Sequence, residues 1–316
     1  MLMKKAFFFI SVPLFLFSCH KNKNTPVTCD SYSIGMTVGT NVTLVATNTN
    51  TGQVIRNYQN IIQVDNYYMG AMGVYDHIHN EYYLYGIVNA TRPILYRLNA
   101  NTGIDDTLGS PLLDTVITLN YLVCNSTTGN LYFLGKNYYT SVNYVYEITP
   151  NTTSFSQRLV CKIPNWGSYV SSPVVDESTG YIYFLASNSP GQGSEYSLIK
   201  VNIANGEASF VAYTGNYPIS GLVYNTNDSM LYGLNVSNIP IKAYPYYSTI
   251  VSYISINPGT GTINTIVDSI GEYASSTTFD YCNNLYVFGY DGLEPSTGKL
   301  VKKFSSSAFW ENAGIY

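Results

Sequence analysis

Charged residues are scarce in this chain. Only 11% of its 316 residues are charged, 15 Lys and Arg against 19 Asp and Glu, which gives a formal net charge of −4. Soluble domains carry about twice this share of charged residues. A mildly acidic balance argues against nucleic-acid binding, which requires a basic patch to neutralise phosphates. We therefore expect no nucleic-acid partner.

Helical patterning and long apolar runs are also scarce. No stretch shows a convincing amphipathic helix, and the apolar run 6–17 is too short to span a bilayer. Tyrosine, in contrast, is abundant, with 32 residues. Tyrosine and β-branched residues suit a half-buried pleated surface, so the composition predicts an all-β fold.

The N-terminus predicts export. Lys4 and Lys5 precede the short apolar run, the pattern of a signal peptide rather than of a folded element. The run ends in Leu16-Phe17-Ser18-Cys19, which resembles the lipobox of bacterial lipoproteins, although Phe17 is bulkier than usual. The resemblance implies cleavage before Cys19 and acylation of that residue, and several acyl chains make a stable membrane anchor. An ordinary secretory signal that happens to contain a cysteine is the alternative.

These features divide the chain into a signal peptide (1–18), a lipidated cysteine with a polar tether (19–38) and one folded domain (39–316). Cleavage removes Lys4 and Lys5 and takes the formal charge from −4 to −6. The tether lacks the acidic cluster that directs lipoproteins of Bacteroidetes-like bacteria to the cell surface. We therefore predict an outer-membrane lipoprotein that faces the periplasm rather than the outside.

A self-similar segment recurs at intervals of about fifty residues, the sign of a repeat architecture. Its core is a Leu-Tyr or Ile-Tyr pair followed by apolar residues and often Gly. We call the shared tyrosines the anchor tyrosines; they are Tyr85, Tyr132, Tyr183, Tyr232 and Tyr286.

Each repeat predicts four short strands, A to D. A strand ending in Asp or Asn precedes each anchor, and a hairpin with an Asn- and Gly-containing turn follows most of them, as in 95–103. Four-stranded antiparallel sheets repeated radially form a β-propeller. We predict a single propeller of six blades, with five or seven as alternatives. The hairpin at 42–62 is expected to complete the last blade and close the ring.

The repeats resemble those of quinoprotein and YVTN-like propellers, with an inner-strand aspartate, a Gly turn and a following Leu-Tyr. The resemblance covers roughly residues 42–305. It implies the propeller fold and says little about activity, because propellers have many unrelated functions.

Four cysteines follow the lipobox, and three complete pairings are open to them. Cys124 and Cys161 fall on strands A and D of one blade, about 14 Å apart. Because bridged Cα atoms lie about 4.4–6.8 Å apart, we expect no bond between them. Cys29 and Cys282 would approach one another where the ring closes, which predicts a Cys29–Cys282 disulfide.

Candidate catalytic chemistry is sparse. His77 and His79 adjoin Asp76, and residues two apart in an extended segment point the same way, which makes these three a candidate metal site. An ordinary polar turn is the alternative. Asp76, Asp176 and Asp280 end A strands, and their repeated places favour turn capping over acid–base catalysis. No Asp-rich calcium loop or phosphate loop is present, so we predict no catalytic residue and no cofactor.

Aromatic residues mark the D–A and B–C connections, which emerge on one face of a propeller. Tyrosine gives contact area at low entropic cost, so this face is a candidate platform for a sugar chain or peptide. Random placement of an abundant residue, or packing between blades, is the alternative. The candidate residues are Tyr67, Tyr68, Tyr138, Tyr139, Trp166, Tyr169, Tyr217, Tyr244, Tyr246, Tyr247 and Tyr273.

The sequence therefore favours a lipid-anchored, non-enzymatic propeller that binds a glycan, peptide or envelope component through this face. A propeller hydrolase, lactonase or lyase with a metal in the central channel is one alternative. A scaffold subunit of an envelope protein complex is another.

Overall fold

The fold is taken from a computed structural model. It describes residues 32–38, 42–48, 51, 53–62, 72–88, 92–103, 105–109, 117–137, 139–140, 142–163, 169–187, 195–216, 219–240, 247–270, 277–280, 283–288 and 291–303.

Every described element is a β-strand, and the strands form one three-stranded and five four-stranded sheets. The three-stranded sheet contains β1 (Tyr32–Val38), β2 (Val42–Asn48) and β3 (Val54–Ile62). We number the four-stranded sheets blade 1 to blade 5. Blade 1 contains β4 (Met72–Asp76), β5 (Glu81–Val88), β6 (Arg92–Asn99) and β7 (Asp105–Gly109), and blade 2 contains β8 (Ile117–Asn125), β9 (Asn130–Asn137), β10 (Asn143–Pro150) and β11 (Phe155–Ile163). Blade 3 contains β12 (Tyr169–Asp176), β13 (Tyr181–Ser187), β14 (Tyr196–Asn202) and β15 (Ala208–Gly215), and blade 4 contains β16 (Ile219–Asn225), β17 (Met230–Pro240), β18 (Tyr247–Ile256) and β19 (Ile263–Val267). Blade 5 contains β20 (Thr277–Asp280), β21 (Leu285–Phe288), β22 (Asp291–Leu293) and β23 (Leu300–Lys303).

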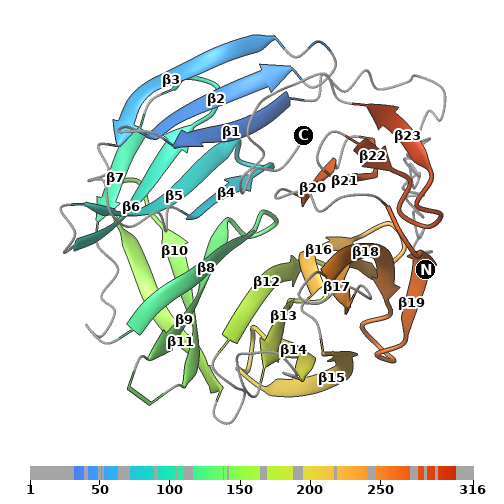
Figure 1. The fold of residues 1–316 in the computed structure, drawn as a ribbon. Helices are drawn as coiled ribbons and strands as arrows, with labels where there is room; N and C mark the ends of the chain where they lie inside the picture. Colours follow the sequence, from blue (N-terminus) through green and yellow to red (C-terminus); the bar gives the residue numbers. More distant parts are fainter. Residues whose placement is uncertain are drawn as a thin grey trace, which may run out of the picture.

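The sheets stand around a ring, and the first strand of each blade lies toward the middle (Figure 1). Within each sheet, strands adjacent in the chain pair antiparallel, so the chain moves outward from strand A to strand D before entering the next blade. None of the described residues forms a helix, and so none forms a helix able to cross a membrane. The arrangement is a single β-propeller.

The repeated segment exists because its tyrosine fills the space between two blades. All five anchor tyrosines lie on the second strand of a blade and are at most 5% exposed. Tyr132, for example, belongs to the apolar cluster that blade 2 forms with Phe184 and Ile199 of blade 3. Tyr183 and Tyr232 do the same toward blades 4 and 5. The core is therefore a series of layers between blades, which is why the same residue type returns in each repeat.

The pairing of the outermost strand is irregular in each sheet, and in two blades this β-bulge contacts the next blade. In β11 the extra residue is Val160, and in β15 it is Val211. The carbonyl oxygens of these two residues face Gly206 and Gly261, the turn glycines between strands C and D of the following blade. Bulges bend a strand and sharpen its twist, which here directs the outer edge toward its neighbour.

Arginines reinforce the same joint. Arg97 of blade 1 donates hydrogen bonds to Asn151 O (3.1 Å) and Thr152 O (2.6 Å) in the outer turn of blade 2. Arg56, on β3, donates to Ala100 O and Asn101 O in the outer turn of blade 1. The three-stranded sheet is therefore joined to blade 1 in the way that one blade is joined to the next.

Two predictions about the ring are wrong. The described residues form five four-stranded blades rather than six, so the count of anchor tyrosines is the count of complete blades. The hairpin 42–62 does not complete the last blade, because β20–β23 come from one continuous stretch. Strands β22 and β23 have only three and four residues, too short to be recognised from sequence. The hairpin pairs instead with β1, which lies in the stretch assigned to the tether.

Candidate functional site

The two faces of the propeller are built differently. The A–B and C–D connections share one face, which we call the turn face, and the B–C and D–A connections share the other, which we call the loop face. On the turn face each A strand ends in a buried acid or amide that caps the turn following it. Asp76, Asn125, Asp176, Asn225 and Asp280 are at most 4% exposed, and the Oδ1 atom of each accepts at least one backbone N–H two or three residues ahead.

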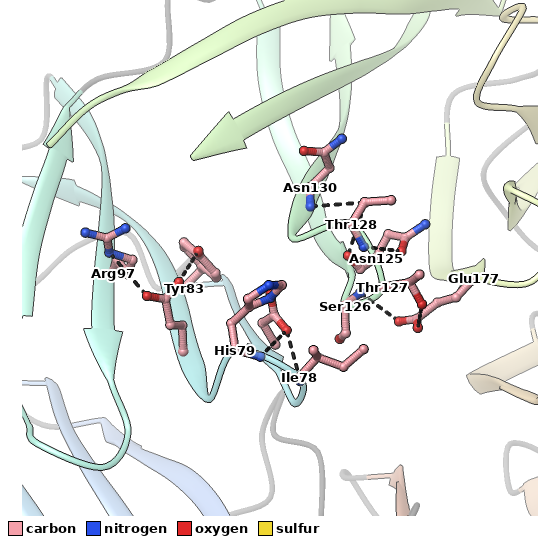
Figure 2. Close-up of polar contacts among 12 residues, drawn as sticks. Ile78, His79, Tyr83, Arg97, Asn125, Ser126, Thr127, Thr128, Asn130 and Glu177 are labelled. Carbon is pink, nitrogen blue, oxygen red and sulfur yellow. Dashed lines mark hydrogen bonds and ion pairs between the residues drawn. The ribbon is translucent and has the colours of Figure 1, made fainter. Parts of the chain in front are cut away.

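Neighbouring turns of this face are also bonded to one another (Figure 2). Glu177 of blade 3 accepts hydrogen bonds from Ser126 N (2.8 Å) and Thr127 Oγ1 (3.0 Å) of blade 2. Asn227 of blade 4 donates to Asn284 Oδ1 of blade 5 at 2.8 Å. The polar side chains of the turn face thus hold the turns and the blades in place.

Turn capping by the A-strand carboxylates, predicted from their repeated positions, is confirmed. Asp176 shows the electrostatics most clearly. Burial acts to raise the pKa of its carboxyl, but hydrogen bonds from Ser178, Thr179 and Tyr224 outweigh burial and hold the pKa below its usual value. These hydrogen bonds therefore favour the ionised form of Asp176 over the protonated form.

The His77–His79 segment is a turn rather than the extended strand assumed for a shared metal ion. His79 Nδ1 lies 2.7 Å from Asp76 Oδ2, while Asp76 Oδ1 accepts Ile78 N and His79 N at 3.1 Å. The imidazole of His79 also lies beside Gly129 of blade 2. Within the described ranges, no three His, Cys, Asp or Glu residues gather as a metal site would require.

No protein-family model and no curated protein matches the sequence. Solved structures do match the fold. TolB from Acinetobacter baumannii superposes with a TM-score of 0.59 at 10% identity, covering 90% of this chain and 66% of TolB. A nidogen/laminin complex chain gives 0.58 at 11% identity, covering 90% of this chain and 97% of that one. A puromycin-hydrolyzing peptidase from Mycobacterium tuberculosis gives 0.52 at 10% identity, covering 86% and 45%.

The chain is a β-propeller. Similarity at 10–11% identity shows the fold alone, and this chain spans less than half of the peptidase. Binding proteins and enzymes both occur among the matches, so the fold alone does not decide the activity.

One residue predicted for the aromatic face has a described side chain, Tyr139 in the connection between β9 and β10. It is 82% exposed, the highest exposure among the large hydrophobic residues described. Asn137 Oδ1 accepts the N–H groups of Tyr139 and Thr140, both at 2.9 Å, which fixes the turn that carries the ring. Tyr169 and Tyr247 are the first residues of β12 and β18, next to a D–A and a B–C connection respectively.

The other predicted residues lie outside the described ranges, namely Tyr67, Tyr68, Tyr138, Trp166, Tyr217, Tyr244, Tyr246 and Tyr273. Cys19, Cys29 and Cys282 lie outside them as well. Cys124 and Cys161 are free thiols on β8 and β11, the opposite edges of blade 2, so the prediction that they would not pair is confirmed. Burial raises the pKa of Cys161 to about 11, which keeps its thiol protonated at neutral pH.

Sequence reasoning missed a group at the loop-face end of blade 2, the end at which the connection carrying Tyr139 lies. Lys162 Nζ lies 5.9 Å from the ring centroid of Tyr144, which stacks on Tyr146 with centroids 6.1 Å apart and an interplanar angle of 14°. Tyr144 directly faces Lys162 in the β10–β11 ladder. The signal was weak, because these residues lie inside strands and meet only through the register.

Proposed function

We propose that this propeller is a non-enzymatic binding module of the bacterial cell envelope. Its ligand is a glycan, a peptide or another envelope component, bound on the loop face by aromatic side chains. A lipid on Cys19 would hold the domain at the outer membrane, facing the periplasm.

The observation that carries this proposal is the exposure of Tyr139 on a turn fixed by hydrogen bonds. Exposing a large ring to water has a cost, and ordering a flexible one on binding has another. A ring carried by a capped turn lowers the second cost, since its backbone is already ordered. Such a ring suits stacking against the apolar face of a sugar or against a peptide side chain.

The turn face supports the same choice. Acid–base chemistry needs carboxylates aimed at a substrate, whereas Asp76, Asp176 and Asp280 accept hydrogen bonds from their own turns. Glu177, which comes from the turn after β12, is bonded to blade 2. The described carboxylates of the inner turns thus act in structure, which favours binding over catalysis.

A ligand screen tests the proposal. The mature protein, extracted in detergent, is heated with oligosaccharides and with envelope peptides, and the shift in unfolding temperature is measured. A ligand at a hundred times its dissociation constant adds about 2.7 kcal/mol to the free energy of unfolding. Tyr139→Ala is expected to weaken binding of a hit about fivefold or more, because removing an aromatic ring on which a flat ligand group stacks costs on the order of 1–3 kcal/mol.

Phe210→Ala is the matched control. Phe210 is also a large exposed aromatic residue, 51% exposed, but it lies on the outermost strand of blade 3 rather than in a connection. It should leave ligand affinity unchanged. Equal losses from both substitutions, or turnover of a ligand during the assay, would count against a loop-face binding module.

The anchor has its own test. Cys19→Ser is expected to abolish incorporation of radioactive palmitate in cells and to release the protein from the membrane fraction. Cys29→Ser, the matched control at the next cysteine, should keep the label. Labelling that survives Cys19→Ser would remove the lipid anchor from the proposal.

A further inference from the structure

The loop-face end of blade 2 combines aromatic rings with an ammonium group. Tyr139 projects from the β9–β10 connection, and that connection leads directly into β10, where Tyr144 is the second residue. Lys162, which is exposed, is the second-last residue of β11 and so lies at the same end of the blade. Its ammonium group lies 5.9 Å from the centroid of the Tyr144 ring.

This end of the blade is also locally basic in a chain with a net negative charge. Lys136, near the end of β9, is the second cation there, directly opposite Asn143. The described residues at this end (117–122, 134–137, 139–140, 142–146 and 159–163) include no carboxylate. The carboxylate of blade 2, Glu147, lies toward the other end, where it pairs with Arg158. The separation of charge within one blade favours an anion at the loop face.

We propose that Tyr139, Tyr144 and Lys162 form a subsite for an acidic sugar unit, one that bears a carboxylate. The proposal rests on the proposed binding function and adds the class of ligand. The rings supply flat apolar surface for the sugar's C–H groups, and Lys162 supplies the charge partner for the carboxylate. A charge-assisted contact is stronger than a neutral one, so the subsite prefers the acid to the neutral sugar.

The test uses uronic-acid tetrasaccharides, each paired with its carboxyl-reduced, neutral counterpart, and the mature protein in detergent. Dissociation constants are measured by calorimetry at low and at high salt. We expect the acids to bind at least about tenfold more tightly than their neutral counterparts, with the difference shrinking at high salt. Lys162→Met should lower affinity for the acid to that of the neutral form and leave the neutral form unchanged.

Lys200→Met is the matched control. Lys200 also lies over a tyrosine, with Nζ 5.4 Å from the centroid of Tyr181, but it is on blade 3 toward the turn-face end of β14. It should change neither affinity. Folding of both variants is checked by their unfolding temperatures.

The outcomes separate this inference from the function it rests on. Equal binding of acids and neutral counterparts, with loss of both in Tyr139→Ala, would overturn the acidic subsite and keep the binding module. An acid preference that survives Lys162→Met would also overturn the subsite. Failure of every tetrasaccharide to bind would reject the subsite, while a peptide ligand in the wider screen would still support the module.

Discussion

Alanine at Gly261 is expected to lower the free energy of unfolding by about 2–5 kcal/mol, one of the largest effects of any single substitution in the ring. Gly261 has a φ of +73°, where an L side chain is strained by about 1–2 kcal/mol. An added Cβ would also lie 2.5 Å from the Val211 carbonyl oxygen and 2.9 Å from the Ala212 Cβ on blade 3. Overpacking of this kind costs about a further 1–3 kcal/mol.

Gly180→Ala separates the two causes. Gly180 has nearly the same φ, +72°, in the inner turn of blade 3, but an added Cβ there would meet no atom within 4 Å. Gly180→Ala should lower the free energy of unfolding only by the cost of backbone strain, about 1–2 kcal/mol. Urea unfolding of both variants side by side measures the difference. Equal losses would mean that blade 3 and the turn of blade 4 do not press on one another.

The contrast also shows which parts of the fold could be read from the sequence. The anchor tyrosines and the A-strand acids repeat because every blade needs one ring for its neighbour and one cap for its turn. They predicted the propeller fold, and their number equals the number of complete blades, although six blades rather than five were predicted. Gly180 and Gly261 look alike in sequence, and only the packing of one blade on the next distinguishes them.

The three-stranded sheet β1–β3 could not be predicted from the sequence for a related reason. Strand β1 (Tyr32–Val38) carries no anchor tyrosine followed by apolar residues, so nothing in its sequence assigned it to a sheet. Its assignment comes from pairing with β2, and the position of the sheet comes from Arg56, which bonds to a turn 44 and 45 residues away.

The candidate site was predictable only in part. The position of Tyr139 in a B–C connection was enough to predict that it lies on the loop face. Its exposure depends on the turn that carries it, and the residues of that turn are adjacent in the sequence. Lys162 and Tyr144 meet across a ladder, and Glu177 bonds to Ser126, 51 residues earlier in the chain. Contacts of that kind depend on register and on the order of blades, which a single sequence does not contain.

Alanine at Asp176 is the second substitution with a large expected effect. The carboxylate accepts hydrogen bonds from Ser178 N at 3.0 Å, Ser178 Oγ at 2.6 Å, Thr179 N at 3.2 Å and Thr179 Oγ1. Hydrogen bonds to a charged group contribute about 1.5–3 kcal/mol, and unsatisfied buried donors add a penalty. We expect Asp176→Ala to lower the free energy of unfolding by about 3 kcal/mol, measured by urea unfolding at pH 7.

Asp176→Asn is the conservative partner, because asparagine already holds this place in blades 2 and 4. Asn125 and Asn225 cap their turns through Oδ1, with Thr128 N at 3.2 Å and Asn227 N at 3.0 Å. The amide keeps the Oδ1 acceptor but places an N–H group where Thr179 Oγ1 now donates. Asp176→Asn is expected to lower the free energy of unfolding by about 1 kcal/mol, because one favourable hydrogen bond is lost while Oδ1 still caps the turn.

The pH dependence of these variants follows from the lowered pKa of Asp176. A carboxyl whose pKa is lower in the folded state stabilises the fold above its unfolded value, near 3.9, and loses that contribution as the pH falls through the folded value. The amide of Asp176→Asn binds no proton in this range. The deficit of Asp176→Asn relative to the natural chain should therefore be constant from pH 7 to about pH 5 and shrink below about pH 4. A deficit that stays the same at pH 3 and pH 7 would show that the cap works without its charge.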